Sequence, residues 1–309
     1  MSGIIVTTAD DVVDATDAVL SLREAITLAN VNPDADTITF DASLNGETLT
    51  LARTELTLRS DITIDGDIDG DNVADITIDG NDASRVFQIS SGGIATLDAL
   101  TITGGNADFG GGINIASGGT ATVANSTLSG NSAYIGGGLS MGGGIYNNSG
   151  GTATVTNSTL SGNTANFGGG ILNRGTATVT NSTLSGNSAL DGGGIANSGG
   201  GTATVTNSTL SGNTANYFGG GISNSGTTTV ANSTLSGNSA NNGGGIFNFG
   251  SATVTNSIVL GNIAGTDAEI RGTVTNTDDL SIIGGVGTAD VFAATAANGA
   301  GVLADNGGP

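Results

Sequence analysis

The strongest constraint on the fold is a repeat of about 25 residues that fills the middle of the chain. Each repeat contains an asparagine followed by serine, a second asparagine six residues later, and a Gly-Gly-Gly-Ile block. The first of these asparagines occupy Asn125, Asn157, Asn181, Asn207, Asn232 and Asn256. Three landmarks with one period indicate a solenoid, in which each repeat is a unit that buries its apolar face only by stacking on its neighbours.

Within a repeat, threonines alternate with apolar residues, which is the period of a strand with one buried face. Val205 is therefore expected to point inward and its threonine neighbours outward. Leu210 follows five residues later, so both side chains face the interior only if the chain bends at Asn207-Ser208. Asparagine tolerates the left-handed backbone that such bends require. Stacking predicts one internal valine column: Val123, Val155, Val179, Val205, Val230 and Val254.

No helical pattern separates the strands, so successive turns must stack directly on one another. We predict an all-β fold: a single-chain right-handed parallel β-helix, or solenoid, of about ten turns of about 25 residues each. Residues 37–108 would form acidic, irregular turns, residues 109–262 the regular Gly/Asn/Thr-rich repeats, and residues 263–309 C-terminal turns and a tail.

Residues 1–36 are predicted to cap the solenoid. Ser21-Leu-Arg-Glu24 has the pattern of a capping box, and Leu22, Ala25, Ile26 and Ala29 fall on one helical face. A short amphipathic helix here would cover the open end of the first turn.

Charge and composition exclude several classes of function. The 309 residues include 27 acidic and 6 basic side chains, for a net charge of −21, so nucleic acid and anionic membranes would be repelled. Cysteine and histidine are absent, which excludes disulfides, thiol or imidazole catalysis and the usual zinc sites. The N-terminus has no signal-peptide pattern, and no run of 18 apolar residues predicts membrane insertion.

Two motifs resemble those of a known class of proteins. Leu20-Ser-Leu-Arg-Glu-Ala-Ile26 resembles the Cys-Ser-Leu-Arg-Glu-Ala segment that precedes right-handed β-helices in large bacterial surface and secreted proteins, with Leu20 in place of Cys. The Leu-Ser-Gly-Asn and Gly-Gly-Gly-Ile repeats are similar to those of polymorphic outer membrane proteins. Leu303–Pro309 resembles the sequence that introduces C-terminal anchor or sorting regions. The resemblance implies an extracellular or cell-surface protein that is exported without an N-terminal signal peptide.

A short acidic loop is a candidate Ca²⁺ site. Carboxylates occupy loop positions 1, 3, 5 and 9, at Asp67, Asp69, Asp71 and Asp75. Val73 would add a carbonyl at position 7, and Asp65 would join if the loop begins earlier. Calcium prefers six to eight oxygen ligands, and the loop lacks the Glu at position 12 of a full EF-hand. The alternative is a solvated acidic turn.

A regular grid of outward threonines is the second candidate site. Its rows include Thr154, Thr156, Thr178, Thr180, Thr204, Thr206, Thr253 and Thr255, and one row is expected to continue to Thr273. Such grids resemble the flat threonine faces of β-helical ice-binding proteins, although threonine is also simply favourable on an exposed strand. The asparagine columns would either bind sugars or form structural hydrogen-bonded ladders.

These features predict a non-catalytic, secreted or cell-surface scaffold, adhesin-like, that presents a Thr/Asn-rich face to a carbohydrate or protein ligand. Self-association through the end turns is a further expectation. The alternative is a polysaccharide lyase or hydrolase, which needs clustered carboxylates, or calcium with an Arg or Lys base, on one face. The regular repeats carry only Arg174 and Asp191 as charged residues, and these lie 17 residues apart, less than one turn, so they do not stack in one column.

Overall fold

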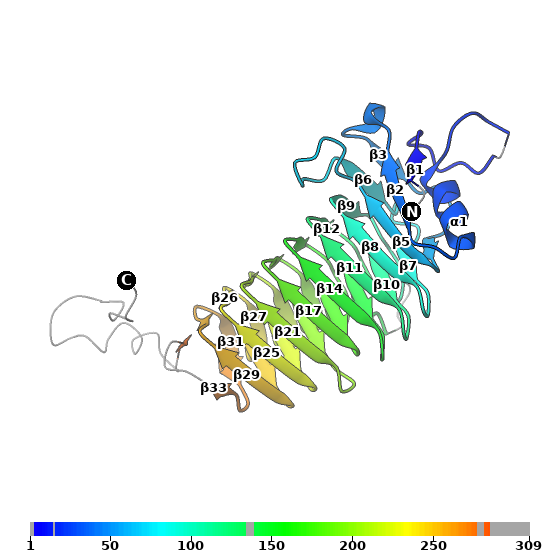
Figure 1. The fold of residues 1–309 in the computed structure, drawn as a ribbon. Helices are drawn as coiled ribbons and strands as arrows, with labels where there is room; N and C mark the ends of the chain where they lie inside the picture. Colours follow the sequence, from blue (N-terminus) through cyan, green and yellow to red (C-terminus); the bar gives the residue numbers. More distant parts are fainter. Residues whose placement is uncertain (1–2, 15, 134–138, 277–280, 285–309) are drawn as a thin grey trace, which may run out of the picture.

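The computed structural model describes residues 3–14, 16–133, 139–276 and 281–284, and it confirms the right-handed parallel β-helix. Strands of successive turns stack in parallel along one axis, from the N-terminal cap to the last C-terminal turns (Figure 1). From β2 (Asp36–Phe40) to β33 (Thr275–Asn276) the chain passes ten times through the largest sheet, which makes nine complete turns. The predicted tail and the Leu303–Pro309 motif lie outside the described residues.

Three sheets run along the solenoid, and a fourth joins them in the later turns. Sheet A contains β1 (Gly3–Val6), β2 (Asp36–Phe40), β5 (Asp61–Asp65), β8 (Ile94–Asp98), β11 (Thr120–Ala124), β14 (Thr152–Thr156), β17 (Thr176–Thr180), β21 (Thr202–Thr206), β25 (Thr227–Ala231), β29 (Ser251–Thr255) and β33 (Thr275–Asn276). Sheet B contains β3 (Thr48–Thr50), β6 (Ile76–Asp79), β9 (Leu100–Thr103), β12 (Thr127–Ser129), β15 (Thr159–Ser161), β18 (Thr183–Ser185), β22 (Thr209–Ser211), β26 (Thr234–Ser236), β30 (Ile258–Val259) and β34 (Ile282–Ile283).

The other two sheets meet at the glycine blocks. Sheet C contains β4 (Leu56–Leu58), β7 (Phe87–Ile89), β10 (Ile113–Ile115), β13 (Ile145–Asn147), β16 (Ile171–Asn173), β20 (Ile195–Asn197), β24 (Ile222–Asn224), β28 (Ile246–Asn248) and β32 (Ile270–Arg271). Sheet D contains β19 (Ser188–Asp191), β23 (Thr214–Phe218), β27 (Ser239–Asn242) and β31 (Ile263–Thr266). A short 3-10 helix, η1, spans Ala42–Leu44.

The core is built from columns of identical residues. The predicted valine column is confirmed, because Val179 pairs with Val205 and Val205 with Val230, and all six valines are buried. Leu210 is also buried, as the bend predicted. Each buried valine or leucine contributes about 1.5 to 3 kcal/mol. Because the partner surface of each turn is the next turn, this burial exists only in the stacked array.

The bend between sheets A and B has the predicted left-handed backbone. Asn207 has a φ of 51°, and the five other asparagines at this corner have φ between 44° and 51°. Their side chains also form a ladder along the corner: the Nδ2 of Asn181 donates to the Oδ1 of Asn157, and the Nδ2 of Asn207 to the Oδ1 of Asn181. The corner asparagines that carry these bonds are thus structural.

A second asparagine ladder runs through the interior. The Nδ2 of Asn187 donates to the Oδ1 of Asn213 at 2.9 Å and to the carbonyl of Leu160 at 3.0 Å. The same pattern joins the members of the whole column: Asn131, Asn163, Asn187, Asn213, Asn238 and Asn262. These side chains are all buried, and each amide from Asn131 to Asn238 obtains its partners from its own column and the backbone.

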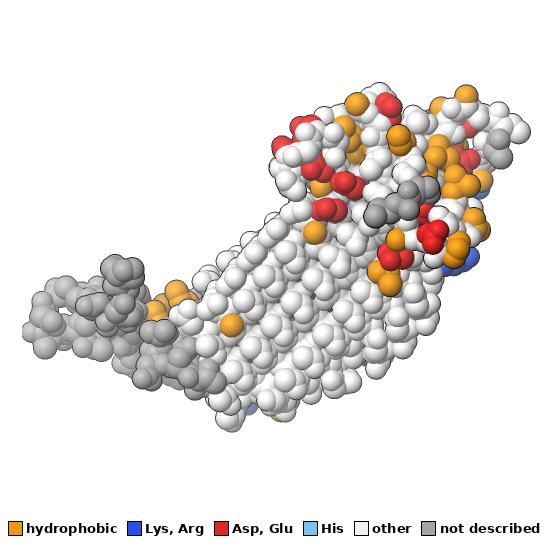
Figure 2. All heavy atoms as spheres, in the orientation of Figure 1, with side chains coloured by type: hydrophobic (Ala, Val, Ile, Leu, Met, Phe, Trp, Pro, Cys, Tyr) orange, Lys and Arg blue, Asp and Glu red, His pale blue; other side chains and the backbone are white. Residues whose placement is uncertain are grey.

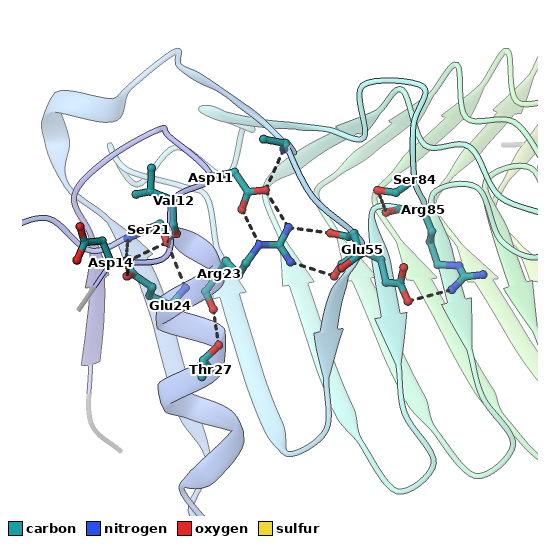
Figure 3. A network of polar contacts seen from close by, with 12 residues as sticks. Asp11, Val12, Asp14, Ser21, Arg23, Glu24, Thr27, Glu55, Ser84 and Arg85 are labelled. Carbon is teal, nitrogen blue, oxygen red and sulfur yellow. Dashed lines mark hydrogen bonds and ion pairs between the residues drawn. The ribbon is translucent and has the colours of Figure 1, made fainter. Parts of the chain in front are cut away.

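The predicted cap is confirmed as helix α1, which spans Leu22–Val31 and begins with a reciprocal capping box between Ser21 and Glu24. Its four predicted apolar residues are buried against the first turns. Arg23 ties the cap to the first turn: it forms an ion pair with Asp11 at 2.7 Å and donates to the carbonyls of Thr54 and Glu55 (Figure 3). The open end of the core is therefore covered.

The register predicts opposite effects at neighbouring positions. Val205→Asp should lower the free energy of unfolding by about 3 kcal/mol or more, because it buries a charge without a partner. Thr204→Asp on the outer face should cost less than about 1 kcal/mol. Urea unfolding followed by circular dichroism measures both, and equal losses in the two variants would contradict the assigned register.

Candidate functional site

The acidic loop connects β5 to β6 near the capped end, where Figure 2 shows the red side chains gathered on the face in view. Asp67, Asp69 and Asp71 each bring a carboxylate oxygen within 4.8 Å of the others. Backbone N–H groups of the loop donate hydrogen bonds to the carboxylates of Asp67 and Asp75 and so fix the loop conformation. Asp67 accepts from Gly70, Asp71 and Asn72 at 2.8 to 3.0 Å, and Asp75 accepts from Ile68 at 2.8 Å.

Like charges oppose ionisation in this loop. The pKa of Asp69 is raised by desolvation and by the neighbouring carboxylates of Asp71, Asp75 and Asp67. The pKa of Asp65, at the end of β5, is raised mainly by burial and also by Asp98 and Asp67. Asp65 and Asp75 lie outside the cluster of three. Oxygen ligands of this kind suit a hard cation, so the loop stays a predicted Ca²⁺ site with Asp67, Asp69 and Asp71 as its first candidates.

The threonine face is longer than the repeats alone indicated. One unbroken column on the outer face of sheet A contains ten stacked threonines: Thr37, Thr63, Thr96, Thr122, Thr154, Thr178, Thr204, Thr229, Thr253 and Thr275. Thr275 continues the column, and the expectation of Thr273 was wrong because the last strand pairs two residues further along. The first three members belong to irregular turns, where the repeat has no landmarks.

Beside this column lie further threonines, including Thr156, Thr180, Thr206 and Thr255, and all are half-buried. From β11 to β29, every outward residue of sheet A is Thr, Ser or Ala. Figure 2 shows the repeat turns as a surface without charged side chains on the face in view. The face therefore offers hydroxyl and methyl groups at a strand spacing of about 4.8 Å.

The two charged residues of the regular repeats do not form a catalytic pair. Arg174 lies over the ring of Tyr146, at 5.9 Å from its centroid, and donates to the Tyr146 hydroxyl. Asp191 ends β19, between Phe167 and Phe218 in its column. Burial raises the pKa of Asp191, and its Oδ1 has no hydrogen-bond partner in the described parts of the chain. None of the ion pairs between described residues joins Arg174 to Asp191.

Comparisons with known proteins support the fold. No protein-family model matches the sequence, so its resemblance to bacterial surface β-helix proteins stays a prediction. No curated protein matches either. Among solved structures, the chain is similar to a mutant of the PL6 family alginate lyase AlyGC, with a TM-score of 0.51 and 14% identity over 92% of this chain. The match covers 39% of the lyase chain, and at this identity it shows the β-helix fold alone.

Among the described residues, no helix is both long and apolar enough to cross a bilayer.

Calcium is expected to stabilise the chain through the acidic loop. A metal that binds only the folded form adds about 2.7 kcal/mol at a hundredfold excess over its Kd. Millimolar Ca²⁺ should raise the melting temperature of the wild type, and much less that of Asp69→Asn/Asp71→Asn. Asp34→Asn/Asp82→Asn removes two exposed acids elsewhere and serves as the control. If isothermal titration detects no heat of calcium binding and EDTA leaves the melting curve unchanged, the loop is a solvated acidic turn and not a calcium site.

Asp191 should destabilise the fold at neutral pH. Burial raises the pKa of Asp191 in the folded state, so ionisation of this carboxyl lowers the free energy of unfolding above that pKa. The loss disappears at low pH, where the carboxyl is protonated in both the folded and the unfolded state. Asp191→Asn should therefore raise the melting temperature at pH 7, and the gain should shrink as the pH falls to about 4. A gain that is independent of pH would contradict this assignment.

Proposed function

We propose that this chain is a non-catalytic scaffold of the secreted or cell-surface type, which presents a neutral hydroxyl and amide face to a surface ligand. The observation that carries the proposal is the column of ten threonines, flanked by further threonine rows, along one side of the solenoid. A face of this length and regularity suits a ligand that is itself repetitive, such as a polysaccharide or a fibrous protein.

The absence of reactive groups on the regular turns supports a non-catalytic role. A lyase needs a base that removes a proton and a group that stabilises the resulting negative charge. The chain contains no lysine or histidine, so among its basic side chains only an arginine could serve as the base. Arg174 is engaged with Tyr146, and Asp191 is half-buried between aromatic neighbours.

Ice binding is a second candidate, favoured by the regularity of the threonine columns. Stacked strands hold hydroxyl and methyl groups at fixed intervals along the axis, about 4.8 Å apart. A rigid array of this kind can order water in a lattice, whereas isolated exposed threonines cannot. The proposal competes with the scaffold role only in the identity of the ligand, because both use the same face.

The purified chain is expected to release no unsaturated or reducing ends from alginate, pectate or polygalacturonate, with or without Ca²⁺. Release of such ends above the level of a blank would contradict the non-catalytic proposal and favour a lyase or hydrolase.

The ice-binding candidate is tested on the same preparation by inhibition of ice recrystallisation, with Thr178→Lys/Thr204→Lys as the variant that interrupts the threonine face. Inhibition that is lost in this variant would identify ice as the ligand, and no inhibition would leave the scaffold role.

A further inference from the structure

A chain of four aromatic rings wraps around one glycine corner near the C-terminal end of the solenoid. The Tyr217 and Phe218 centroids lie 6.3 Å apart, Phe218 stacks on Phe247 at 4.4 Å, and Phe247 meets Phe249 edge-on at 4.6 Å. These four are a large share of the eleven phenylalanines and tyrosines of the whole sequence. The inner ring, Phe247, is buried, while the two outer rings are open to solvent.

Folding gives no reason for an aromatic residue at position 249. Its ring is 77% exposed, so it contributes little burial to the folded state. The same corner position in the four preceding turns, identified by its backbone bond to the turn before, holds the polar residues Asn148, Arg174, Ser198 and Ser225. Serine occupies this corner in the two preceding turns, so the turn does not require a ring here. Phe249 and Tyr217 are the exposed ends of one connected aromatic cluster, and an exposed apolar patch of this kind indicates a contact surface.

The exposed ring forms one wall of a cavity of about 530 Å³, a size typical of small-molecule sites. Besides Phe247 and Phe249, the cavity is lined by Asp267, Arg271 and Thr273. Arg271 donates to Asp267 at 3.1 Å, and both side chains are 44% exposed. The site thus combines a flat apolar wall with a hydrogen-bond donor and an acceptor held side by side.

We propose that this cavity binds a pyranose ring of a neutral polysaccharide. A pyranose has an apolar face that can stack on Phe249 and a rim of hydroxyls that can donate to Asp267 and accept from Arg271. A protein partner would need about 800 Å² of buried surface on each side, far more than two exposed rings. A polyanionic glycan would find no unpaired cation in the lining, because Arg271 is already paired with Asp267.

The site is separate from the threonine face and does not depend on what that face binds. Isothermal titration of the full chain with barley β-glucan, konjac glucomannan and alginate tests the proposal. Phe249→Ser, which installs the residue found one turn earlier, should weaken binding of at least one neutral glycan about tenfold. Its melting temperature should not change, because the ring is exposed. Arg271→Gln is the second variant, and Asp34→Asn, an exposed position near the capped end that belongs to neither the cavity nor the threonine face, is the control that should bind normally.

Binding that falls in both cavity variants but not in Asp34→Asn supports the site. Three results would overturn it: no binding of either neutral glycan by the wild type, equal binding by Phe249→Ser, or binding of alginate alone. Cleavage of any of these glycans would instead show as new reducing or unsaturated ends. That result would refute the non-catalytic scaffold without removing the sugar site.

Discussion

Each turn of this β-helix leaves polar groups in its interior that only the adjacent turn can satisfy. Asn187 is fully buried, and both its side-chain amide and its backbone N–H donate to the carbonyl oxygen of the Asn213 side chain. A turn that slipped in register would leave such donors unpaired, at a cost of about 1 to 3 kcal/mol for each group. The spacing between successive ladder asparagines varies from 24 to 32 residues, yet every one remains in the column. The ladder therefore fixes the register, and changes in turn length are taken up elsewhere.

This arrangement determines where chemistry can occur on the molecule. Inside the regular turns, space is filled by valine, leucine, isoleucine and asparagine, and sheet A presents threonine outside. A charged side chain placed in such a column would lie about 4.8 Å from its counterparts above and below. The acidic cluster and the aromatic cavity accordingly lie toward opposite ends of the solenoid, where the columns are irregular or end. The long middle presents a regular surface of threonine hydroxyl and methyl groups.

The periodic features were predictable from sequence, and those that depend on register between unequal turns were not. The valine column, the left-handed asparagine corner and the capping helix each follow from a local pattern that repeats or has a known signature. Thr37, Thr63 and Thr96 join the threonine column only through strand pairing in turns that lack landmarks. Phe218 and Phe247 meet across a glycine corner from different turns, although no spacing in the repeat relates them. In the acidic loop, the spacing predicted four converging carboxylates, but only those of Asp67, Asp69 and Asp71 lie together. The carboxylate of Asp75 instead accepts a hydrogen bond from the backbone N–H of Ile68.

The ends of the regular array follow from the polarity of its ladders. An asparagine side chain both donates and accepts, so it can continue a ladder of side-chain hydrogen bonds from one turn to the next. An ionised carboxylate only accepts, so the ladder ends there. In the interior ladder the amides donate toward the C-terminus, and the last, Asn262, donates to the carboxylate of Glu269 at 2.6 Å. In the corner ladder they donate toward the N-terminus, and Asn125 donates to the carboxylate of Asp98 at 2.8 Å. The two ladders thus end on acids at opposite ends of the array. Glu269 and Asp98 thus each accept the last donor of a ladder and offer no donor to a further turn, whereas the strand pairing of the sheets continues beyond both.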